Sequence, residues 1–140
     1  MSRMSDYAGK WLAGDVELAP IAALLGVRPV SLGEGEAKVE LTAGKNLHNA
    51  MGTVHGGVFC DLADVAMGVA LATVTADGES FSTLQLQMSY LLPVVEGRIS
   101  AHARVLRRGR GTAHLECDLE DGEGRHVARA SSVCAIKPAG

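Results

Sequence analysis

The order of apolar and polar positions predicts one long helix set among several β-strands. Residues 58–76 are rich in Ala, Leu, Val and Met, and Asp77-Gly78 follows them as a helix stop. Because this segment has no polar stripe, we expect its helix to be buried rather than to lie on a surface. Short helical patterns over residues 6–25 precede it, and Gly26 is placed to end the second of them.

Strict alternation predicts strands on both sides of this helix. The expected strands are residues 27–32, 36–41, 81–92, 98–107, 112–120 and 125–136, with turns at residues 33–35, 93–97, 109–111 and 121–124. A sheet with one apolar face and a single apolar helix to cover is expected to wrap around that helix. The predicted fold class is therefore α+β, with a curved antiparallel sheet around one long central helix.

The strand expected at residues 81–92 has two unlike faces. Its apolar face consists of Leu84, Leu86, Met88, Tyr90 and Leu92, and its opposite face of Phe81, Thr83, Gln85, Gln87 and Ser89. Four of the five residues on the second face are polar but uncharged, whereas a solvated strand face usually carries Lys or Glu. This indicates a subunit interface or a ligand wall, with a merely exposed strand as the plainer alternative.

Length and composition exclude several classes of protein. The 140 residues predict one domain over residues 1–140, including an N-terminal helical segment at residues 1–25. Apolar residues make up 47% and charged residues 21%, which excludes disorder. A net charge of −3 argues against binding to a nucleic acid backbone.

Neither metal-binding nor targeting patterns occur. The three Cys include no CxxC and the five His no HxxxH, so no metal site and no disulfide framework is expected. The first ten residues lack the apolar core of a signal peptide. Asp61 and Asp64 interrupt the most apolar window, which argues against a membrane span. We therefore expect a cytoplasmic protein without a membrane or nucleic acid partner.

The stretch from Asn49 to Asp64 carries the candidate chemistry. His55, Gly56 and Gly57 stand where the long helix begins, and glycines there allow a close approach of other atoms. The free N–H groups and positive dipole end of a helix start suit a developing oxyanion. Asp64 lies about two turns further on, where a carboxylate among apolar residues is costly unless it is paired or used.

Helical geometry places Gly57, Asp64 and Gly68 within roughly 40° of one another. Asp64 therefore lies between two positions without side chains, which leaves room for a ligand or for a tight helix contact. No Lys or Arg occurs from residue 46 to residue 97, so no cation near in sequence can pair with it. Asp61 lies about 60° away and closer to the helix start, where a carboxylate complements the dipole.

Each of these residues also has a purely structural interpretation. Asp64 could be a satisfied buried acid, His55 a helix cap, and the glycine pair a site of close packing. The cysteines Cys60, Cys117 and Cys134 lie within apolar patterns and are expected to be packing residues.

The ordered motif Asn-x-x-Gly-x-x-His-Gly-Gly-x-x-x-x-Leu-Ala-Asp, at residues 49–64, resembles the hotdog-fold acyl-CoA thioesterases of the phenylacetic-acid-degradation (PaaI-like) subgroup. The similarity runs from about residue 27 to residue 136 and includes the strand that ends Tyr90-Leu-Leu-Pro93. The hotdog fold, one long helix wrapped by an antiparallel sheet, agrees with the patterning. Another subgroup has Glu at the carboxylate and Thr one turn later, and Asp64 with Gly68 disfavours it.

The resemblance implies a role for each residue of the motif. Asp64 is the expected catalytic carboxylate, as general base on water or as direct nucleophile. The backbone N–H of Gly56 is the expected oxyanion donor, and Asn49, supplied across a dimer interface, helps to bind carbonyl and water. His55 would orient this loop or lie near the sulfur. The Thr83 hydroxyl matches a position that helps to hold the water.

A basic hairpin is expected between the fourth and fifth strands. Five arginines, at residues 98, 104, 107, 108 and 110, fall within thirteen residues that contain no acid. Guanidinium groups bind phosphates bidentately, so Arg107, Arg108, Gly109 and Arg110 are candidates for binding the phosphates of coenzyme A. Gly57 is a further candidate for substrate contact. An edge guard or a solubility patch is the alternative interpretation of the arginines.

The resemblance implies hydrolysis of an acyl-CoA or aryl-acyl-CoA to free acid and CoA, without a metal or redox cofactor. Family members are homodimers or dimers of dimers, with the site between subunits. One alternative is a hotdog enoyl-thioester hydratase or dehydratase, which would use His55 and an acid for proton transfer at carbon. Another is a non-enzymatic acyl-CoA-binding regulatory module. The set of Asn49, Gly56 and Asp64 favours hydrolysis.

Overall fold

The computed structural model describes residues 3–16 and 19–139, so the predicted helical positions 1–2 and 17–18 lie outside the described residues. The described elements are α1 (Arg3–Ala13), α2 (Pro20–Leu25), β1 (Arg28–Gly33), β2 (Glu36–Ala43), the 3-10 turn η1 (Lys45–Leu47), α3 (Gly56–Ala72), β3 (Glu79–Tyr90), β4 (Gly97–Arg108), β5 (Thr112–Asp121) and β6 (His126–Pro138). Each predicted strand is present to within two residues at either end.

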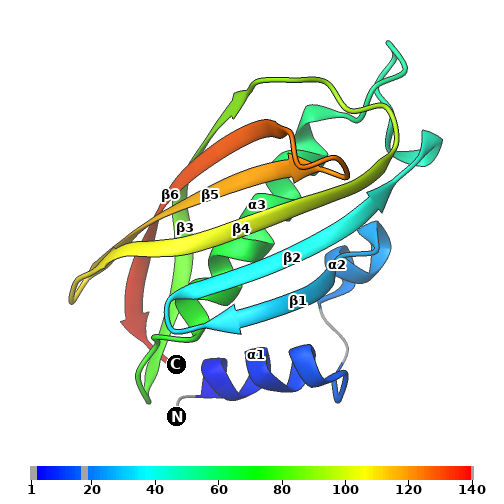
Figure 1. Ribbon diagram of the computed structural model, residues 1–140. Helices are drawn as coiled ribbons and strands as arrows, with labels where there is room; N and C mark the ends of the chain where they lie inside the picture. Colours follow the sequence, from blue (N-terminus) through cyan, green and yellow to red (C-terminus); the bar gives the residue numbers. More distant parts are fainter. Residues whose placement is uncertain (1–2, 17–18, 140) are drawn as a thin grey trace.

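The strands form one antiparallel sheet in the order β1-β2-β4-β5-β6-β3. The sheet curves around α3, and α1 lies across the end of the molecule near β1 (Figure 1). This is the predicted α+β architecture of one long helix wrapped by an antiparallel sheet. Gly26 ends α2 in the left-handed conformation, with φ of 72°, as the sequence predicted.

The core lies between α3 and the sheet face that curves around it. Alanines on both surfaces let helix and sheet approach each other, and larger aliphatic side chains fill the remaining space. The largest fully buried side chains are Val39, Leu41, Leu62, Met67, Leu71, Ile99, Leu115, Cys117, Leu119, Val127 and Cys134. Burying one such aliphatic side chain contributes about 1.5–3 kcal/mol, so this contact fixes where α3 lies in the sheet.

The helix α3 ends four residues earlier than the pattern predicts. The hydroxyl groups of Thr73 and Thr75 donate to carbonyl oxygens of its last turn, at 2.7 and 2.8 Å. These bonds satisfy carbonyls that the end of a helix leaves without partners. The apolar pattern continues through residue 76, which is why it did not indicate this end.

A β-bulge at Leu84 changes which side chains of β3 face the core. Before the bulge, Phe81 packs against the core and Thr83 reaches α3, whereas after it Leu86 and Met88 face inward. Leu84 is 63% exposed. The predicted division of this strand into two faces is therefore wrong before the bulge, because one extra residue shifts a period of two by one step.

The sheet covers only one side of α3. Asp61 and Asp64 lie on the other side and are exposed, and Asp64 contacts Thr83 of the edge strand β3. The expectation of a helix buried all round is wrong here, because the sheet ends at β3 and no further strand among the described residues continues it. Within the described residues, no helix is both long and apolar enough to cross a membrane.

Candidate active site

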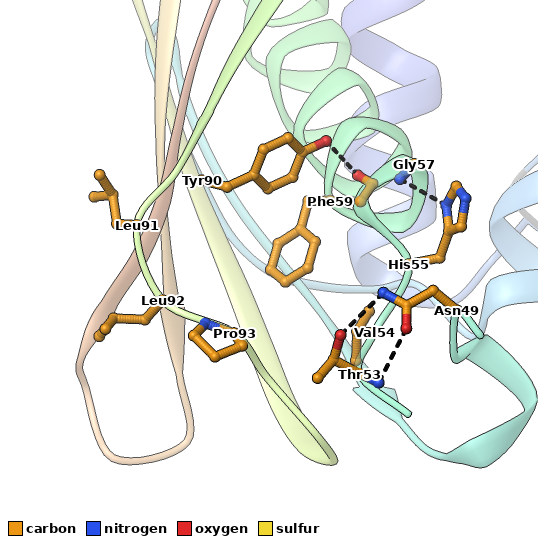
Figure 2. Close-up of a pocket in the computed structure, with 11 residues that line it drawn as sticks. Asn49, Thr53, Val54, His55, Gly57, Phe59, Tyr90, Leu91, Leu92 and Pro93 are labelled. Atoms are coloured by element: carbon orange, nitrogen blue, oxygen red, sulfur yellow. Dashed lines mark hydrogen bonds between the residues drawn. The ribbon is translucent and has the colours of Figure 1, made fainter. Parts of the chain in front are cut away.

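A cavity of about 620 Å³ opens at the N-terminal end of α3 (Figure 2). One wall is the loop before the helix, and the opposite wall is the end of β3 with the residues after it. Its lining consists of Asn49, Thr53, Val54, His55, Gly56, Gly57, Phe59, Tyr90, Leu91, Leu92 and Pro93. The structure thus brings together four predicted site residues, Asn49, His55, Gly56 and Gly57, in a largely apolar setting.

His55 caps the helix and leaves one backbone donor beside it unused. Its Nδ1 accepts a hydrogen bond from the Gly57 N–H at 2.9 Å. This contact is the helix cap that was the structural interpretation of His55. Within the described residues, the Gly56 N–H donates to no protein acceptor. It therefore lies at the positive end of the helix dipole, available to an oxygen in the cavity.

Asn49 uses its side chain within its own loop. Its amide nitrogen donates to the Thr53 hydroxyl at 2.9 Å, and its Oδ1 accepts from the N–H groups of Met51 and Thr53 at 2.9 and 3.2 Å. This arrangement folds residues 49–53 into a turn beside the helix start. The amide nitrogen has a second proton, so Asn49 can still donate to a ligand.

Asp64 and Thr83 form a second pair of predicted site residues. The Thr83 hydroxyl donates to Asp64 Oδ1 at 3.0 Å, which the bulge at Leu84 makes possible by turning Thr83 toward α3. Asp64 forms no ion pair within the described residues. Burial and the neighbouring charge of Asp64 raise the pKa of Asp61, although His55 acts in the opposite direction. Asp64 is thus an exposed carboxylate held by a hydroxyl.

The Gly56 N–H and the Asp64 carboxylate lie at different positions along the axis of α3. Gly56 and Asp64 are eight residues apart, which corresponds to about 12 Å of helix. A general base that activates a water for attack on a carbonyl carbon lies within about two hydrogen-bond lengths of that carbon. One chain therefore separates its free N–H from its own carboxylate by more than this reach.

The basic hairpin is largely neutralised by acids from other strands. Arg108 forms an ion pair with Glu79, and Arg98 lies 4.0 Å from Glu40. Hydrogen bonding to Arg108 lowers the pKa of Glu79. Arg107 and Arg110 are exposed and form no ion pair among the described residues. These ion pairs could not be predicted from the sequence, because the acids lie on strands that are remote in the chain.

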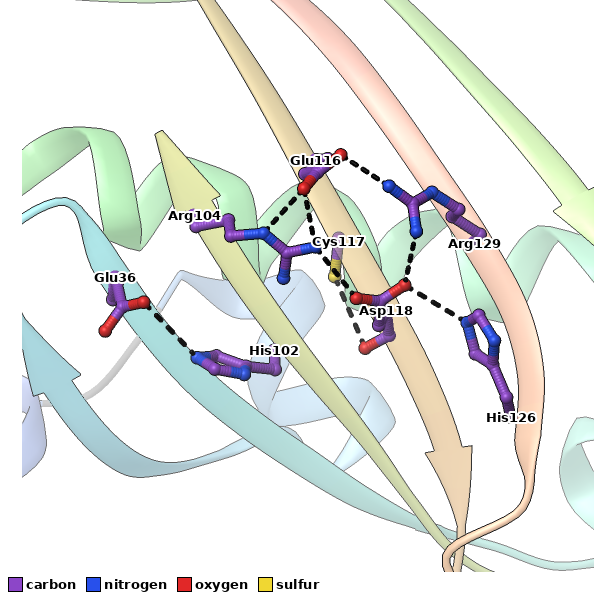
Figure 3. A network of polar contacts seen from close by, with 8 residues as sticks. All are labelled: Glu36, His102, Arg104, Glu116, Cys117, Asp118, His126 and Arg129. Atoms are coloured by element: carbon purple, nitrogen blue, oxygen red, sulfur yellow. Dashed lines mark hydrogen bonds and ion pairs between the residues drawn. The ribbon is translucent and has the colours of Figure 1, made fainter. Parts of the chain in front are cut away.

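Arg104 belongs to a separate network on the outer face of the sheet (Figure 3). Its guanidinium donates to Glu116 at 2.6 Å and to Asp118 at 3.0 Å. Arg129 donates to Glu116 at 2.5 Å, and His126 lies 3.1 Å from Asp118. Although burial acts to raise it, the pKa of Asp118 is lowered by its contacts with Arg104. This network joins β4, β5 and β6 and takes Arg104 out of the candidate phosphate site.

The hairpin tip also lies far from the cavity of the same chain. Arg108 contacts Glu79 at the first residue of β3, whereas Tyr90 at its last residue lines the cavity. A strand of this length spans roughly 35 Å. The tip and the loop before α3 accordingly stand at opposite ends of the sheet (Figure 1). Arg107, Gly109 and Arg110 can therefore meet a ligand in this cavity only from another copy of the chain.

Sequence reasoning missed Tyr90 as a site residue and placed it only on an apolar strand face. Its hydroxyl donates to the Gly56 carbonyl oxygen at 2.7 Å. Cys60, half-buried and not a core residue, lies beside it with a sulfur-to-oxygen distance of 3.4 Å. Tyr90 is 53% exposed, and the available signal was the polar tip of a tyrosine in an otherwise aliphatic pattern, since the hydroxyl of a partly covered tyrosine usually takes a hydrogen-bond partner. Cys117 and Cys134 are buried packing residues, as predicted.

Among the described residues, no group of three or more His, Cys, Asp or Glu side chains could hold a metal ion. The site consists of backbone and side-chain donors around an apolar cavity, with the Asp64 carboxylate about 12 Å further along the helix.

A curved antiparallel sheet around one long helix, with a glycine pair at the helix start, defines the hotdog class of enzymes. The chain belongs to the thioesterase superfamily, whose family model matches residues 51–128, more than half of its length. It is therefore a thioesterase-type hydrolase. Among its relatives is the 1,4-dihydroxy-2-naphthoyl-CoA hydrolase of Listeria monocytogenes, 26% identical over 81% of this chain and 92% of that protein.

Solved structures agree with this assignment. A phenylacetic acid degradation-related protein of Ralstonia eutropha superposes with a TM-score of 0.84 at 28% identity, over 92% of this chain and 98% of that one. The PaaI protein from the phenylacetic acid degradation operon of E. coli superposes with a TM-score of 0.83 over 98% and 96% of the two chains. At 24% identity, the second similarity supports the fold.

Proposed function

We propose that the protein hydrolyses an acyl-CoA or aryl-acyl-CoA thioester to the free acid and CoA. The observation that carries the proposal is the unused Gly56 N–H at the start of α3. Gly56 and Asn49 both line the same apolar cavity. The resemblance of residues 49–64 to acyl-CoA thioesterases supports it, as does a relative named as an acyl-CoA hydrolase.

Thioester hydrolysis needs hydrogen-bond donors for the carbonyl oxygen and a group that activates or supplies the nucleophile. The Gly56 N–H, with Asn49 beside it, binds the carbonyl oxygen and stabilises the negative charge that develops on it. Asp64 removes a proton from an attacking water, or attacks the carbon itself to form a mixed anhydride that a water then hydrolyses. In either route the carbon–sulfur bond breaks and CoA leaves as the thiolate. The Thr83 hydroxyl, bonded to Asp64 Oδ1, keeps that carboxylate in one orientation. No step requires a metal or a redox cofactor.

The separation of Gly56 and Asp64 along one helix supports a site built from two chains. The edge strand β3 gives a route, because it lies beside the exposed side of α3 and has an unpaired edge. At the opposite edge, β1 contains Pro29 and an irregular register between Pro29 and Ser31, which discourage further pairing. We therefore propose a homodimer joined along β3, alone or as half of a dimer of dimers.

A panel of CoA thioesters tests the function. The panel contains short aliphatic, long aliphatic, phenylacetyl, hydroxyphenylacetyl, benzoyl and enoyl thioesters, and the measurement is release of free thiol. We expect thiol release from at least one of the saturated or aromatic thioesters. Hydration of the enoyl thioester without thiol release would instead establish a hydratase, and binding without turnover a regulatory module.

The exposed arginines of the hairpin tip provide a test of CoA recognition. In the Arg107→Ala/Arg110→Ala variant we expect KM to rise about tenfold, the equivalent of one lost charge-assisted hydrogen bond. We expect kcat to change little, because phosphates lie far from the bond that breaks. Added salt should raise the KM of the parent protein and have less effect on the variant.

Arg108 is left in place in that variant because Glu79 already engages it. Arg28→Ala is the matched control, since the Arg28 side chain is 62% exposed and, among the described residues, pairs only with Glu40 on the neighbouring strand. An unchanged KM in the double variant would show that the phosphates bind elsewhere.

A further inference from the structure

We propose that Tyr90 is a positioning residue: its hydroxyl and the His55 ring together clamp the peptide between Gly56 and Gly57, and so fix the direction of the Gly56 N–H. The inference rests on the proposed function, because that direction matters for catalysis only if a substrate oxygen meets this N–H.

The clamp holds the peptide at both of its polar ends. The Tyr90 hydroxyl donates to the Gly56 carbonyl oxygen at 2.7 Å, and the Gly57 N–H donates to His55 Nδ1 at 2.9 Å (Figure 2). Two successive glycines have more conformational freedom than any other pair, so an unclamped start of α3 would sample several orientations. The Gly56 N–H belongs to the preceding peptide, whose His55 carbonyl oxygen accepts a hydrogen bond from the Val58 N–H at 3.0 Å, so with the following peptide also held its direction is fixed from both sides.

Both glycines are explained by the rings that cover them. A Cβ at Gly56 would lie 2.9 Å from the Tyr90 hydroxyl oxygen and 3.0 Å from its Cζ. A Cβ at Gly57 would lie 3.0 Å from His55 Nδ1. Neither glycine has a positive φ, so the pair is required for space and not for an unusual backbone conformation. The close approach that the glycines permit is that of the chain's own two rings.

Tyr90 is itself held in place from behind. Its ring meets the ring of Phe59 edge to face, with centroids 5.8 Å apart and an interplanar angle of 85°. Phe59 is buried in the core, so it anchors Tyr90 to the body of the fold. Burial raises the pKa of Tyr90 to about 12, with a further contribution from Cys60. The hydroxyl therefore remains protonated and able to donate.

The test is Tyr90→Phe in the full-length protein, which keeps the ring and its contact with Phe59. We expect kcat to fall about tenfold with KM within about twofold, less than the 10²–10³ that loss of an oxyanion donor itself costs. Hydrogen exchange of the Gly57 amide, followed by NMR, should become at least about tenfold faster, because the clamped peptide opens more often.

Tyr7→Phe is the matched control, since Tyr7 on α1 is the other tyrosine of the chain, and it should leave both quantities unchanged. Parent values of kcat or of Gly57 exchange in Tyr90→Phe would overturn the proposal. A lower kcat with unchanged exchange would mean that the hydroxyl acts on substrate directly. If the parent protein released no thiol from any thioester, the proposed function would fail, and the exchange rate alone would decide whether the clamp exists.

Discussion

Asp64→Asn is expected to fold normally and to lower kcat by about 10²–10⁴, the usual cost of removing a general base. Asparagine has nearly the shape of aspartate, and its Oδ1 can still accept the hydrogen bond from Thr83 that is 3.0 Å long in the parent. It cannot take a proton from water and is a poor nucleophile, so either role of Asp64 is lost. The loss should appear in kcat and not in KM, because the interaction is made in the transition state.

Asp61→Asn is the control for this measurement. Asp61 lies on the same exposed side of α3, about 60° around the helix from Asp64, and the chemical change is identical. It should leave kcat within a few-fold of the parent, measured as thiol release from the best substrate of the panel. If Asp61→Asn were inactive and Asp64→Asn active, the assignment of the catalytic carboxylate to Asp64 would be wrong. If both variants remained active, hydrolysis by this site would be in doubt.

The fold could be predicted because its pattern is local and repeated. Alternation places Ile99, Ala101 and Ala103 of β4 inward in the sequence, and all three are buried. The apolar helix needed a cover, and the sheet supplies it on one side. Where the prediction failed, one residue was enough: the bulge at Leu84 moves Thr83 from the outer face to the side of Asp64. A period of two contains no information about where an extra residue is inserted.

The candidate site could be predicted only in part from the sequence, for a related reason. His55, Gly56 and Gly57 are neighbours in sequence, so a helix start was enough to place them together. The contact between Tyr90 and Gly56 joins residues 34 positions apart, and the pairing of Arg108 with Glu79 joins residues 29 apart. Such contacts depend on how the sheet folds back on the helix, which local pattern does not describe. The basic hairpin was therefore predicted without the acids that neutralise most of it.

Mixing two inactive variants is expected to restore activity if the site is shared between chains. Asn49→Ala and Asp64→Asn, each refolded alone, should be nearly inactive. In a dimer that contains one chain of each kind, one site combines the intact Asn49 and Gly56 of one chain with the intact Asp64 of the other. Random pairing of equal amounts should then recover about a quarter of the parent activity, because half of the dimers are mixed and each has one intact site.

A complementary test refolds the double variant Asn49→Ala/Asp64→Asn with an equal amount of parent chain and measures the loss of activity. If the site is shared, every mixed dimer has one lesion in each site, and only parent dimers work, about a quarter of the activity of an all-parent sample. If each chain carries its own complete site, the same mixture retains about half, and the two single variants give no recovery. The shared site is expected on geometric grounds, because about 12 Å of helix separates Gly56 from Asp64 within one chain. Recovery in the first mixture and excess loss in the second would together place the carboxylate of one chain opposite the oxyanion donor of its partner.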